Sequence, residues 1–350
     1  MRGVHPTAEA LSVFLLLFLG LTAWGSEPVT PSSSEAGSAL TAPPEPRSYG
    51  PFVMDEKLAP RVKFWVDVYV KYHSWEAVIT DIKYPQLVFS VADTRGKPGA
   101  IPAEKRKVSS LLRQLAWKSP FLKNGTLKRS QLRPQEIQVL ETFEKNNLLD
   151  ELKAISEDPR RLRAQLGLRD ALEDALFVSG RYLPRMEALF GRFRLPTEIA
   201  YLPFVESGFN KKAVSKVGAS GIWQFMPYTG KLYLRVDDVV DERNDPMRAA
   251  EAAARLMKQN YDLLGDWPMA ITAYNHGTTG VARASRETGS RAISEIIERV
   301  KIPSFGFASQ NFYACFLAAL HVGKNSETYL GVLPRARKLE FDEFVMPDYM

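Results

Sequence analysis

The segment from Pro196 to Asn210 combines a helical apolar pattern with a carboxylate near its end. Ile199 and Leu202 precede Glu206 by seven and four residues, so in a helix the three side chains share one face. Pro203 would kink such a helix without having to end it. A carboxyl group on a face made for burial tends to keep its proton near neutral pH, as a general acid must. The alternative is a surface glutamate at a fraying helix end.

Three further motifs follow this segment in order. They read GASGIWQFMP at Gly218–Pro227, AYNHG at Ala273–Gly277 and NFY at Asn311–Tyr313. Together with the Glu206-Ser207 pair, they resemble the motifs of lytic transglycosylases in the goose-lysozyme-like superfamily, specifically the membrane-bound type D branch. The likeness is strong over residues 160–323 and weaker over residues 58–159 and the tail. One motif would be weak evidence, whereas four in the same order are strong evidence.

The resemblance implies an enzyme that cuts the β-1,4 bond between N-acetylmuramic acid and N-acetylglucosamine in peptidoglycan. Most glycosidases use two carboxylates, but this family resembles the substrate-assisted exceptions. One glutamate protonates the leaving oxygen, and the 2-acetamido carbonyl of the muramyl sugar stabilises the cation. The same glutamate then takes the proton of the 6-hydroxyl, which closes a 1,6-anhydro ring. The glycan strand is the expected partner, with neither a metal nor a cofactor.

The resemblance also assigns roles to residues. Glu206 becomes the catalytic acid and base, and the residues expected to bind or orient substrate are Ser207, Gln224, Met226, Tyr274, Asn275 and Tyr313. The hydroxyl of Tyr313 is expected near Glu206, where it would tune the proton affinity of the carboxyl group. Asn275 is expected to hold the acetamido group or to fix the cleft, and the side-chain amide of Gln224, which can both donate and accept hydrogen bonds, is expected to contact sugar groups.

Several of these residues have plainer interpretations. Ser207 could bond its own helix end, and Met226 could fill the core. Trp223 could stack on a sugar or fill the core, and His276 is better explained by structure than by catalysis. The acidic residues between Asp237 and Asp245 indicate a solvated loop with one helix cap. They could instead supply a second carboxylate, which would make the protein a hydrolytic muramidase, or bind calcium, although the EF-hand spacing is missing. A glycan-binding scaffold without catalysis is the third alternative.

The formal net charge of the 350-residue chain is +6 and its isoelectric point is near 9.2. Such a bias suits anionic lipid, anionic wall polymer or nucleic acid, or serves solubility alone. Zinc-finger spacing, RNP-like aromatic runs and long Lys/Arg blocks are missing, so we expect no nucleic-acid partner. Cys315 is the single cysteine, which excludes an intramolecular disulfide. Its apolar helical surroundings predict a buried, inert thiol.

Residues 1–25 have the pattern of an export signal, with Arg2, an apolar stretch from Leu11 to Leu21 and a small-residue cleavage pattern at Ala23–Gly25. A retained N-terminal anchor is the alternative, and the lack of a nearby cysteine argues against a lipoprotein. Residues 26–50 are expected to be a disordered linker. We therefore expect an exported protein of the periplasm or cell envelope of a Gram-negative bacterium, without an integral membrane span after signal cleavage.

The remaining sequence predicts a mainly α fold: a lysozyme-like helical catalytic domain over 166–323, preceded by a helical accessory region over 51–165 that carries a small β-hairpin. Residues 58–72 fit both a strand and a helix, and their length favours a helix. The hairpin is predicted at 77–81 and 87–91. Apolar periodicity predicts helices at 103–118, 134–146, 147–157, 160–166, 168–179, 183–190, 246–264, 267–275 and 310–322, with a wrapping tail containing at most one strand over 324–350.

Overall fold

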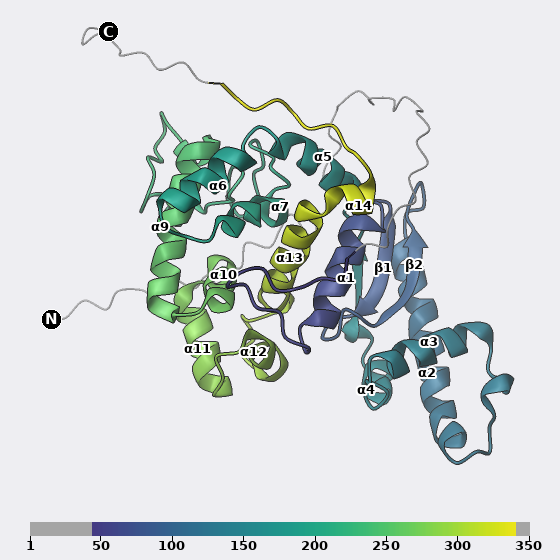
Figure 1. Cartoon of the computed structure of the whole chain (residues 1–350). Coiled ribbons are helices and arrows are strands. Elements are labelled where there is room, and N and C mark those ends of the chain that lie inside the picture. The colour runs from purple at the N-terminus through teal and green to yellow at the C-terminus, as the bar shows by residue number, and fades with distance from the viewer. Residues whose placement is uncertain (1–43, 341–350) are drawn as a thin grey trace, which may run out of the picture.

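The structure is a computed structural model that describes residues 44–340 (Figure 1). The predicted signal peptide, most of the predicted linker and the last ten residues lie outside the described residues. The helices, in chain order, are α1 (Ala59–Val70), α2 (Ala100–Lys123), α3 (Pro134–Lys145), α4 (Glu151–Glu157), α5 (Arg169–Ser179), α6 (Leu183–Arg192), α7 (Leu202–Glu206), α8 (Pro227–Gly230), α9 (Pro246–Leu264), α10 (Trp267–His276), α11 (Thr278–Thr288), α12 (Ile293–Arg299), α13 (Phe307–Lys324) and α14 (Ser326–Leu330). The predicted mainly α fold is confirmed.

The strands β1 (Glu76–Asp81), β2 (Val88–Asp93) and β3 (Leu162–Leu166) form one antiparallel sheet in the order β2-β1-β3. The predicted hairpin is confirmed. The helix predicted at 160–166 is wrong, because this segment forms a short 3₁₀ turn and then pairs with β1, with Ala164 opposite Ile79. A segment this short gains too few internal hydrogen bonds to hold a helix alone, so pairing with the sheet decides its conformation. Arg161 fixes it there by a bidentate pair with the buried Asp81, at 2.7 and 2.8 Å.

Local sequence signals set several helix ends. The Asp245 side chain accepts hydrogen bonds from the backbone N–H groups of Met247 and Arg248, and so caps α9 as predicted. Gly265, at φ +65°, ends that helix in the left-handed conformation. The run from Pro196 is helical in two parts, because a 3₁₀ segment at Thr197–Tyr201 precedes α7. The described part of the tail, up to residue 340, contains α14 and extended chain but no strand.

Helix α1 packs along α13, and both belong to one hydrophobic cluster that also contains residues of α7, α9 and α10 (Figure 1). A polar clamp joins the two helices inside this cluster. The Asn311 Oδ1 atom accepts hydrogen bonds from Arg61 Nη1 at 2.9 Å and from Trp65 Nε1 at 3.0 Å. The Asn311 amide in turn donates to the Phe307 carbonyl at 2.7 Å. Asn311 therefore fixes where α1 lies on the motif-bearing helix.

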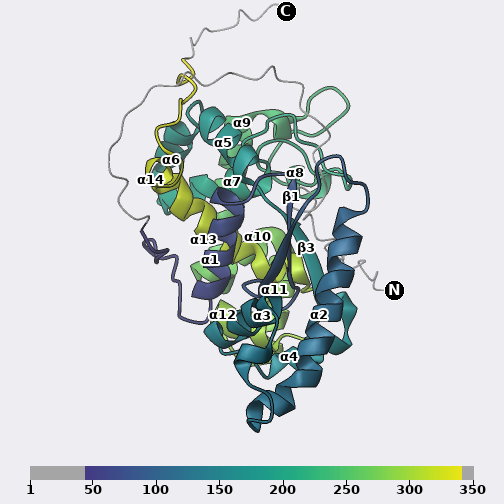
Figure 2. The same cartoon turned by 90° about the vertical axis from the view of Figure 1, so that its right-hand side faces the viewer.

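A second hydrophobic cluster holds α2, α3 and α4 against the outer face of the sheet. Its members include Leu112 of α2, Phe143 of α3 and Ile155 of α4, all buried. In Figure 2 these helices form the lower end of the molecule, away from α5, α6 and α7. The domain boundary at residue 165 stays a prediction. The buried residues of α1 belong to the first cluster, whereas those between residues 79 and 162 belong largely to the second. Within residues 44–340, no helix has both the length and the apolar character needed to cross a membrane.

We predict that Asn311→Ala lowers the free energy of unfolding by about 3 kcal/mol, because it removes the buried acceptor of both Arg61 Nη1 and Trp65 Nε1 and leaves Arg61 only the Lys83 carbonyl. Urea denaturation followed by circular dichroism measures the change. The control is Lys324→Ala on the same helix, whose ammonium group lies at a partly exposed position 3.7 Å from Glu198; it should change stability by less than about 0.5 kcal/mol. Equal effects of the two substitutions would contradict the clamp.

Candidate active site

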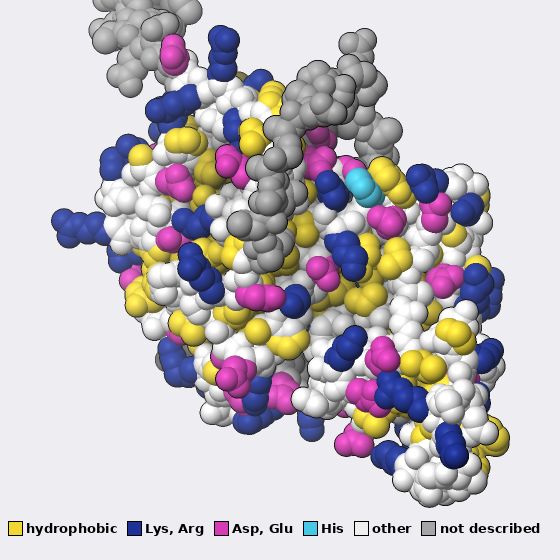
Figure 3. Space-filling model, turned by 45° about the vertical axis from the view of Figure 1, so that its right-hand side comes forward, with side chains coloured by type: hydrophobic (Ala, Val, Ile, Leu, Met, Phe, Trp, Pro, Cys, Tyr) yellow, Lys and Arg dark blue, Asp and Glu magenta, His cyan; other side chains and the backbone are white. Residues whose placement is uncertain are grey.

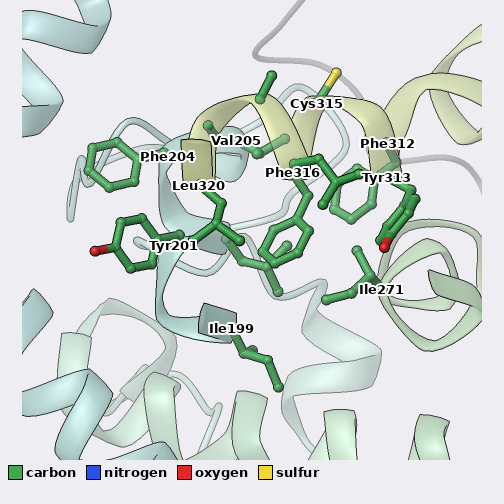
Figure 4. Packing of buried hydrophobic residues seen from close by; sticks show 14 of the residues in the cluster. Ile199, Tyr201, Phe204, Val205, Ile271, Phe312, Tyr313, Cys315, Phe316 and Leu320 are labelled. Carbon is green, nitrogen blue, oxygen red and sulfur yellow. The ribbon is translucent and has the colours of Figure 1, made fainter. Parts of the chain in front are cut away.

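Glu206 is the last residue of α7, a helix whose other four residues are all buried. Pro203 lies at the second position of this helix, where a missing N–H group costs no internal hydrogen bond. In Figure 4, Val205 and Phe204 lie against α13, with Leu320 and Phe316 beside them. After Glu206 the chain reverses through Gly208 at φ +60° and Phe209 at φ +58°, and the Phe209 N–H donates to the Pro203 carbonyl. This turn leaves the carboxyl group at the end of a rigidly packed helix.

The Glu206 residue keeps part of its surface accessible, whereas Leu202, Phe204 and Val205 of the same helix are buried in the first hydrophobic cluster. Burial raises the pKa of the Glu206 carboxyl group to about 8, and no other carboxylate contributes to that shift. Among residues 44–340, no side chain forms a hydrogen bond or ion pair with it. The carboxyl group is therefore protonated at neutral pH, as predicted from the sequence pattern.

The charge of this carboxyl group acts on two tyrosines from distant parts of the chain. Burial raises the pKa of Tyr274 on α10 well above its ordinary value, and the negative charge of Glu206 raises it further. Burial, then Cys315, then Glu206 raise the pKa of Tyr69 on α1 in the same direction. The Tyr274 hydroxyl donates to the Trp223 carbonyl at 2.8 Å, whereas the buried Tyr69 hydroxyl has no hydrogen-bond partner within the described chain.

Sequence reasoning missed Tyr69, because α1 carries no motif and lies more than 130 residues upstream of Glu206. Its apolar periodicity gave no sign that one tyrosine hydroxyl would be left without a partner. A buried hydroxyl is rarely left unbonded without a reason. Here the neighbouring acid provides one.

Tyr313 does not lie where the sequence predicted it. Its side chain is fully buried, and its hydroxyl donates to the Val53 carbonyl at 2.9 Å. Burial, followed by the charges of Asp266 and Asp55, raises the pKa of Tyr313; Glu206 takes no part. The expectation of a hydroxyl near Glu206 is therefore wrong for this residue. The reason is the helix face: in Figure 4 the Tyr313 ring points away from the α7 side of the cluster, and the N-terminal segment covers it.

The motif segment from Gly218 to Met226 is tied to the end of α7. The Ser207 hydroxyl donates to the Ile222 carbonyl at 2.8 Å. Both hydrogens of the Gln224 amide go to backbone carbonyls, those of Ala213 at 3.1 Å and Gly221 at 2.9 Å. Its Oε1 atom is thus the part of the side chain left to contact a ligand.

Trp223 and Met226 of the same segment differ in how far they are buried. Trp223 is completely buried against Phe190, with ring centroids 5.7 Å apart, so it fills the core and does not stack on a sugar. Met226, the last residue of the segment, is half-buried and lies directly before α8.

Arg243 supports this segment from behind. Its Nη1 atom donates to the carbonyls of Gly218 at 2.8 Å and Phe225 at 3.0 Å. Asp241 holds the same guanidinium group through two bonds of 2.9 and 2.7 Å. Gly221 lies directly over the Arg243 carbonyl, since a Cβ atom there would come within 2.0 Å of that oxygen. The glycine serves close backbone packing here.

Asn275 and His276 share Ser309 of α13. The Ser309 hydroxyl lies 3.2 Å from Asn275 Oδ1 and 2.9 Å from His276 Nδ1. The Nδ2 atom of the half-buried Asn275 makes no hydrogen bond within residues 44–340 and is available as a donor. His276 is buried edge-on against Phe305, and burial lowers its pKa, so it is neutral at pH 7. These contacts give His276 a structural role.

Most of the acidic residues between Asp237 and Asp245 are engaged in local structure. Asp237 pairs with Arg235 at 2.6 Å, Asp241 pairs with Arg243, and Asp245 caps α9. In the described part of the chain, no group of His, Cys, Asp and Glu side chains is arranged to hold a metal ion. The thiol of Cys315 is buried, and burial raises its pKa well above the ordinary value.

A helical body whose motif segments converge on one buried carboxyl group defines a lysozyme-like α domain. Residues 192–297 match the family model described as the transglycosylase SLT domain. The match covers α7, the Gly218–Met226 segment, α9 and α10, whereas α1 and α13 lie outside it.

The chain is similar to three kinds of named protein. It is 30% identical over 191 residues to the membrane-bound lytic murein transglycosylase D of Escherichia coli (strain K12), which is 53% of this chain and 42% of the relative. It is 36% identical over 102 residues to a putative tributyltin chloride resistance protein of Alteromonas sp. (strain M-1), covering 28% of this chain and 48% of that protein. It is 35% identical over 95 residues to the transglycosylase of Enterobacteria phage PRD1, covering 27% and 34%. The chain thus spans less than half the length of these relatives.

We predict that Gly221→Ala lowers folding stability and substrate binding far more than an alanine substitution at a glycine where the only cost is a positive φ. Gly289, at φ +65°, is the control, because nothing lies within 4 Å of a Cβ atom placed there. Gly289→Ala should cost about 1 kcal/mol of folding free energy. Gly221→Ala adds a collision with the Arg243 backbone, should cost at least about 3 kcal/mol, and should weaken binding of peptidoglycan fragments. Thermal unfolding and fragment titration measure both. Similar losses for the two variants would contradict the packing role of Gly221.

Proposed function

We propose that the protein is a lytic transglycosylase that cleaves the β-1,4 bond between N-acetylmuramic acid and N-acetylglucosamine in peptidoglycan without using water, and forms 1,6-anhydromuramyl ends. The observation that carries this proposal is the buried carboxyl group of Glu206, which has no counter-charge and is kept protonated by burial alone. The presence of the transglycosylase SLT domain supports it. The periplasm or cell envelope is the proposed site of action, which the predicted export signal supports.

In the first step, the protonated Glu206 donates its proton to the glycosidic oxygen, and the bond to the muramyl C1 breaks. The 2-acetamido carbonyl of the same sugar bonds to C1 and carries the positive charge. The free Nδ2 donor of Asn275 suits the acetamido group, and the free Oε1 acceptor of Gln224 suits a sugar hydroxyl or amide. Met226 borders the bound sugar, and Ser207 holds the Ile222 carbonyl in place while its oxygen can still accept a hydrogen bond.

In the second step, the ionised Glu206 takes the proton of the muramyl 6-hydroxyl, and the 6-oxygen closes the ring on C1. The carboxylate must be stabilised between the two steps, although it has no ion pair. The unpartnered hydroxyl of Tyr69 is the group able to do this, because it can donate a hydrogen bond once Glu206 has lost its proton. Tyr69 is thus a positioning residue for the base.

A hydrolytic muramidase would need a second carboxylate to activate water. Of the acidic residues that the sequence offered for this role, Asp237, Asp241 and Glu242 are paired with arginines and Asp245 caps a helix, and no acidic residue, Asp238 included, contributes to the pKa of Glu206. A scaffold that only binds glycan has no use for a protonated acid. Both alternatives are therefore weaker, and product analysis separates them from the proposal.

We expect Glu206→Gln to lower the rate of sacculus digestion by at least about 100-fold, since the amide cannot donate or reclaim the proton. For the native protein, mass spectrometry of the products should show anhydromuramyl ends, and the rate should fall as pH rises through about 8, where Glu206 ionises. Glu198→Gln, eight residues upstream, is the control and should keep the native rate. Reducing ends in the products would favour hydrolysis, and full activity of Glu206→Gln would remove the assignment.

We expect Tyr69→Phe to lower kcat by about tenfold and to move the alkaline limb of the pH–rate profile upward by up to about one pH unit. The direction follows because the hydroxyl stabilises the ionised carboxylate, so its loss raises the pKa of Glu206. Tyr313→Phe, the control, removes a hydroxyl bonded to Val53 and should cost about 1 kcal/mol of stability without moving the profile. An unshifted profile in Tyr69→Phe, or an equal shift in both variants, would show that Tyr69 does not act on Glu206.

A further inference from the structure

Helix α2 exposes an aromatic pair on the lobe formed by α2, α3 and α4. The side chain of Trp117 is 70% exposed and that of Phe121 is 38% exposed. Their ring centroids lie 5.3 Å apart. Two large aromatic rings at successive turns, both facing solvent, are unusual on a surface helix, since apolar area of this size is normally buried.

The pair belongs to a stripe that runs along the helix opposite its buried face. At 100° per residue, Arg106, Arg113, Trp117 and Phe121 fall within about 80° of one another, and all four are exposed. Val108, Leu112 and Leu115 point the opposite way, into the hydrophobic cluster of the lobe. The stripe, which we call the outer α2 face, is about 22 Å long from Arg106 to Phe121. The fold of the lobe therefore does not need these four side chains.

Charge is concentrated on the same part of the lobe. Residues 95–133 contain eleven lysines and arginines and one glutamate, whereas acidic residues predominate over 134–160. Several cations pair with those acids, such as Arg129 with Glu141 and Glu144. Arg106, Arg113 and Lys128 have no ion pair with any other residue between 44 and 340. Figure 3 shows Lys and Arg side chains over this lobe at the lower right of the molecule.

We propose that the outer α2 face binds the surface of a membrane that contains anionic lipids, with Trp117 and Phe121 inserted among the headgroups and the arginines on lipid phosphates. An aromatic pair flanked by unpaired cations on one helix face is the pattern of interfacial binding. The attraction of each cation adds to the apolar term near an anionic surface. The face is convex and lies on a single helix, which fits a plane. Sugar sites, in contrast, are concave.

This inference does not depend on the proposed reaction, because α2 packs into the second hydrophobic cluster and α7, which carries Glu206, packs into the first. The lobe would then hold the protein at a membrane surface while the Glu206 site remains free for its substrate. Binding to the membrane should weaken as the salt concentration rises, since salt ions screen the exposed charges.

The experiment measures flotation of the full chain with vesicles of phosphatidylcholine alone and with about 30% phosphatidylglycerol, a fraction typical of an anionic leaflet. We expect binding to the anionic vesicles, and at least about tenfold weaker partitioning for the double variants Trp117→Ala/Phe121→Ala and Arg106→Glu/Arg113→Glu. Both should fold normally, because the four side chains are exposed. Both should also digest sacculi at the native rate, which separates this test from that of the proposed reaction.

Matched controls sit on the other lobe. Leu263→Ala removes a side chain that is 65% exposed on α9, and Arg283→Glu/Arg286→Glu reverses two exposed charges on α11; neither should alter vesicle binding. Equal binding to neutral vesicles, or equal binding by native protein and α2 variants, would overturn the proposal. So would the loss of sacculus binding in the α2 variants with vesicle binding intact, which would assign the face to glycan.

Discussion

An acid buried without a counter-charge is the constraint on which the rest of the site depends. Glu206 ends a helix that is otherwise fully buried, and its pKa of about 8 lies well above the ordinary 4.5. In the unfolded chain the carboxyl group ionises above pH 4.5, whereas in the folded protein it stays protonated up to about pH 8. The unfolded state therefore binds fewer protons in this interval, and folding stability declines as pH rises from about 4.5 to 8. The protein is less stable at neutral pH than it would be with an amide in this place.

Segments far outside the matched domain complete the site. The match ends at residue 297, yet α13 carries Ser309, which orients Asn275, and Asn311, which holds α1. Helix α1 in turn carries Tyr69, on whose hydroxyl the charge of Glu206 acts. The clamp at Asn311 thus fixes the helix that carries this hydroxyl. A domain defined by residues 192–297 alone would contain the acid without the proposed donor.

The sequence predicted what depends on local pattern, and missed what depends on tertiary contacts. The predicted helix at 246–264 has the bounds of α9, because the neighbouring residues Asp245 and Gly265 determine its two ends. The strand β3 was not predicted, since its pairing with β1 overrides the short apolar periodicity that suggested a helix. Likewise, Tyr313 was assigned to Glu206 from a motif, but which face of α13 it occupies depends on the N-terminal segment that covers it. Gly221 could be recognised as a turn residue, but not as a contact of Arg243.

The two hydrophobic clusters explain how one chain can carry two independent surfaces. The first cluster holds the acid, the tyrosines and the motif segments, and any change in it moves the catalytic geometry. The second holds α2 by its inner face alone, so the outer face is free to acquire aromatic and cationic residues without a cost to folding. The sheet connects the clusters, because Val78 of β1 belongs to the first and Ile79 to the second. Adjacent residues of one strand point to opposite faces, so a single strand supports the site on one side and the lobe on the other.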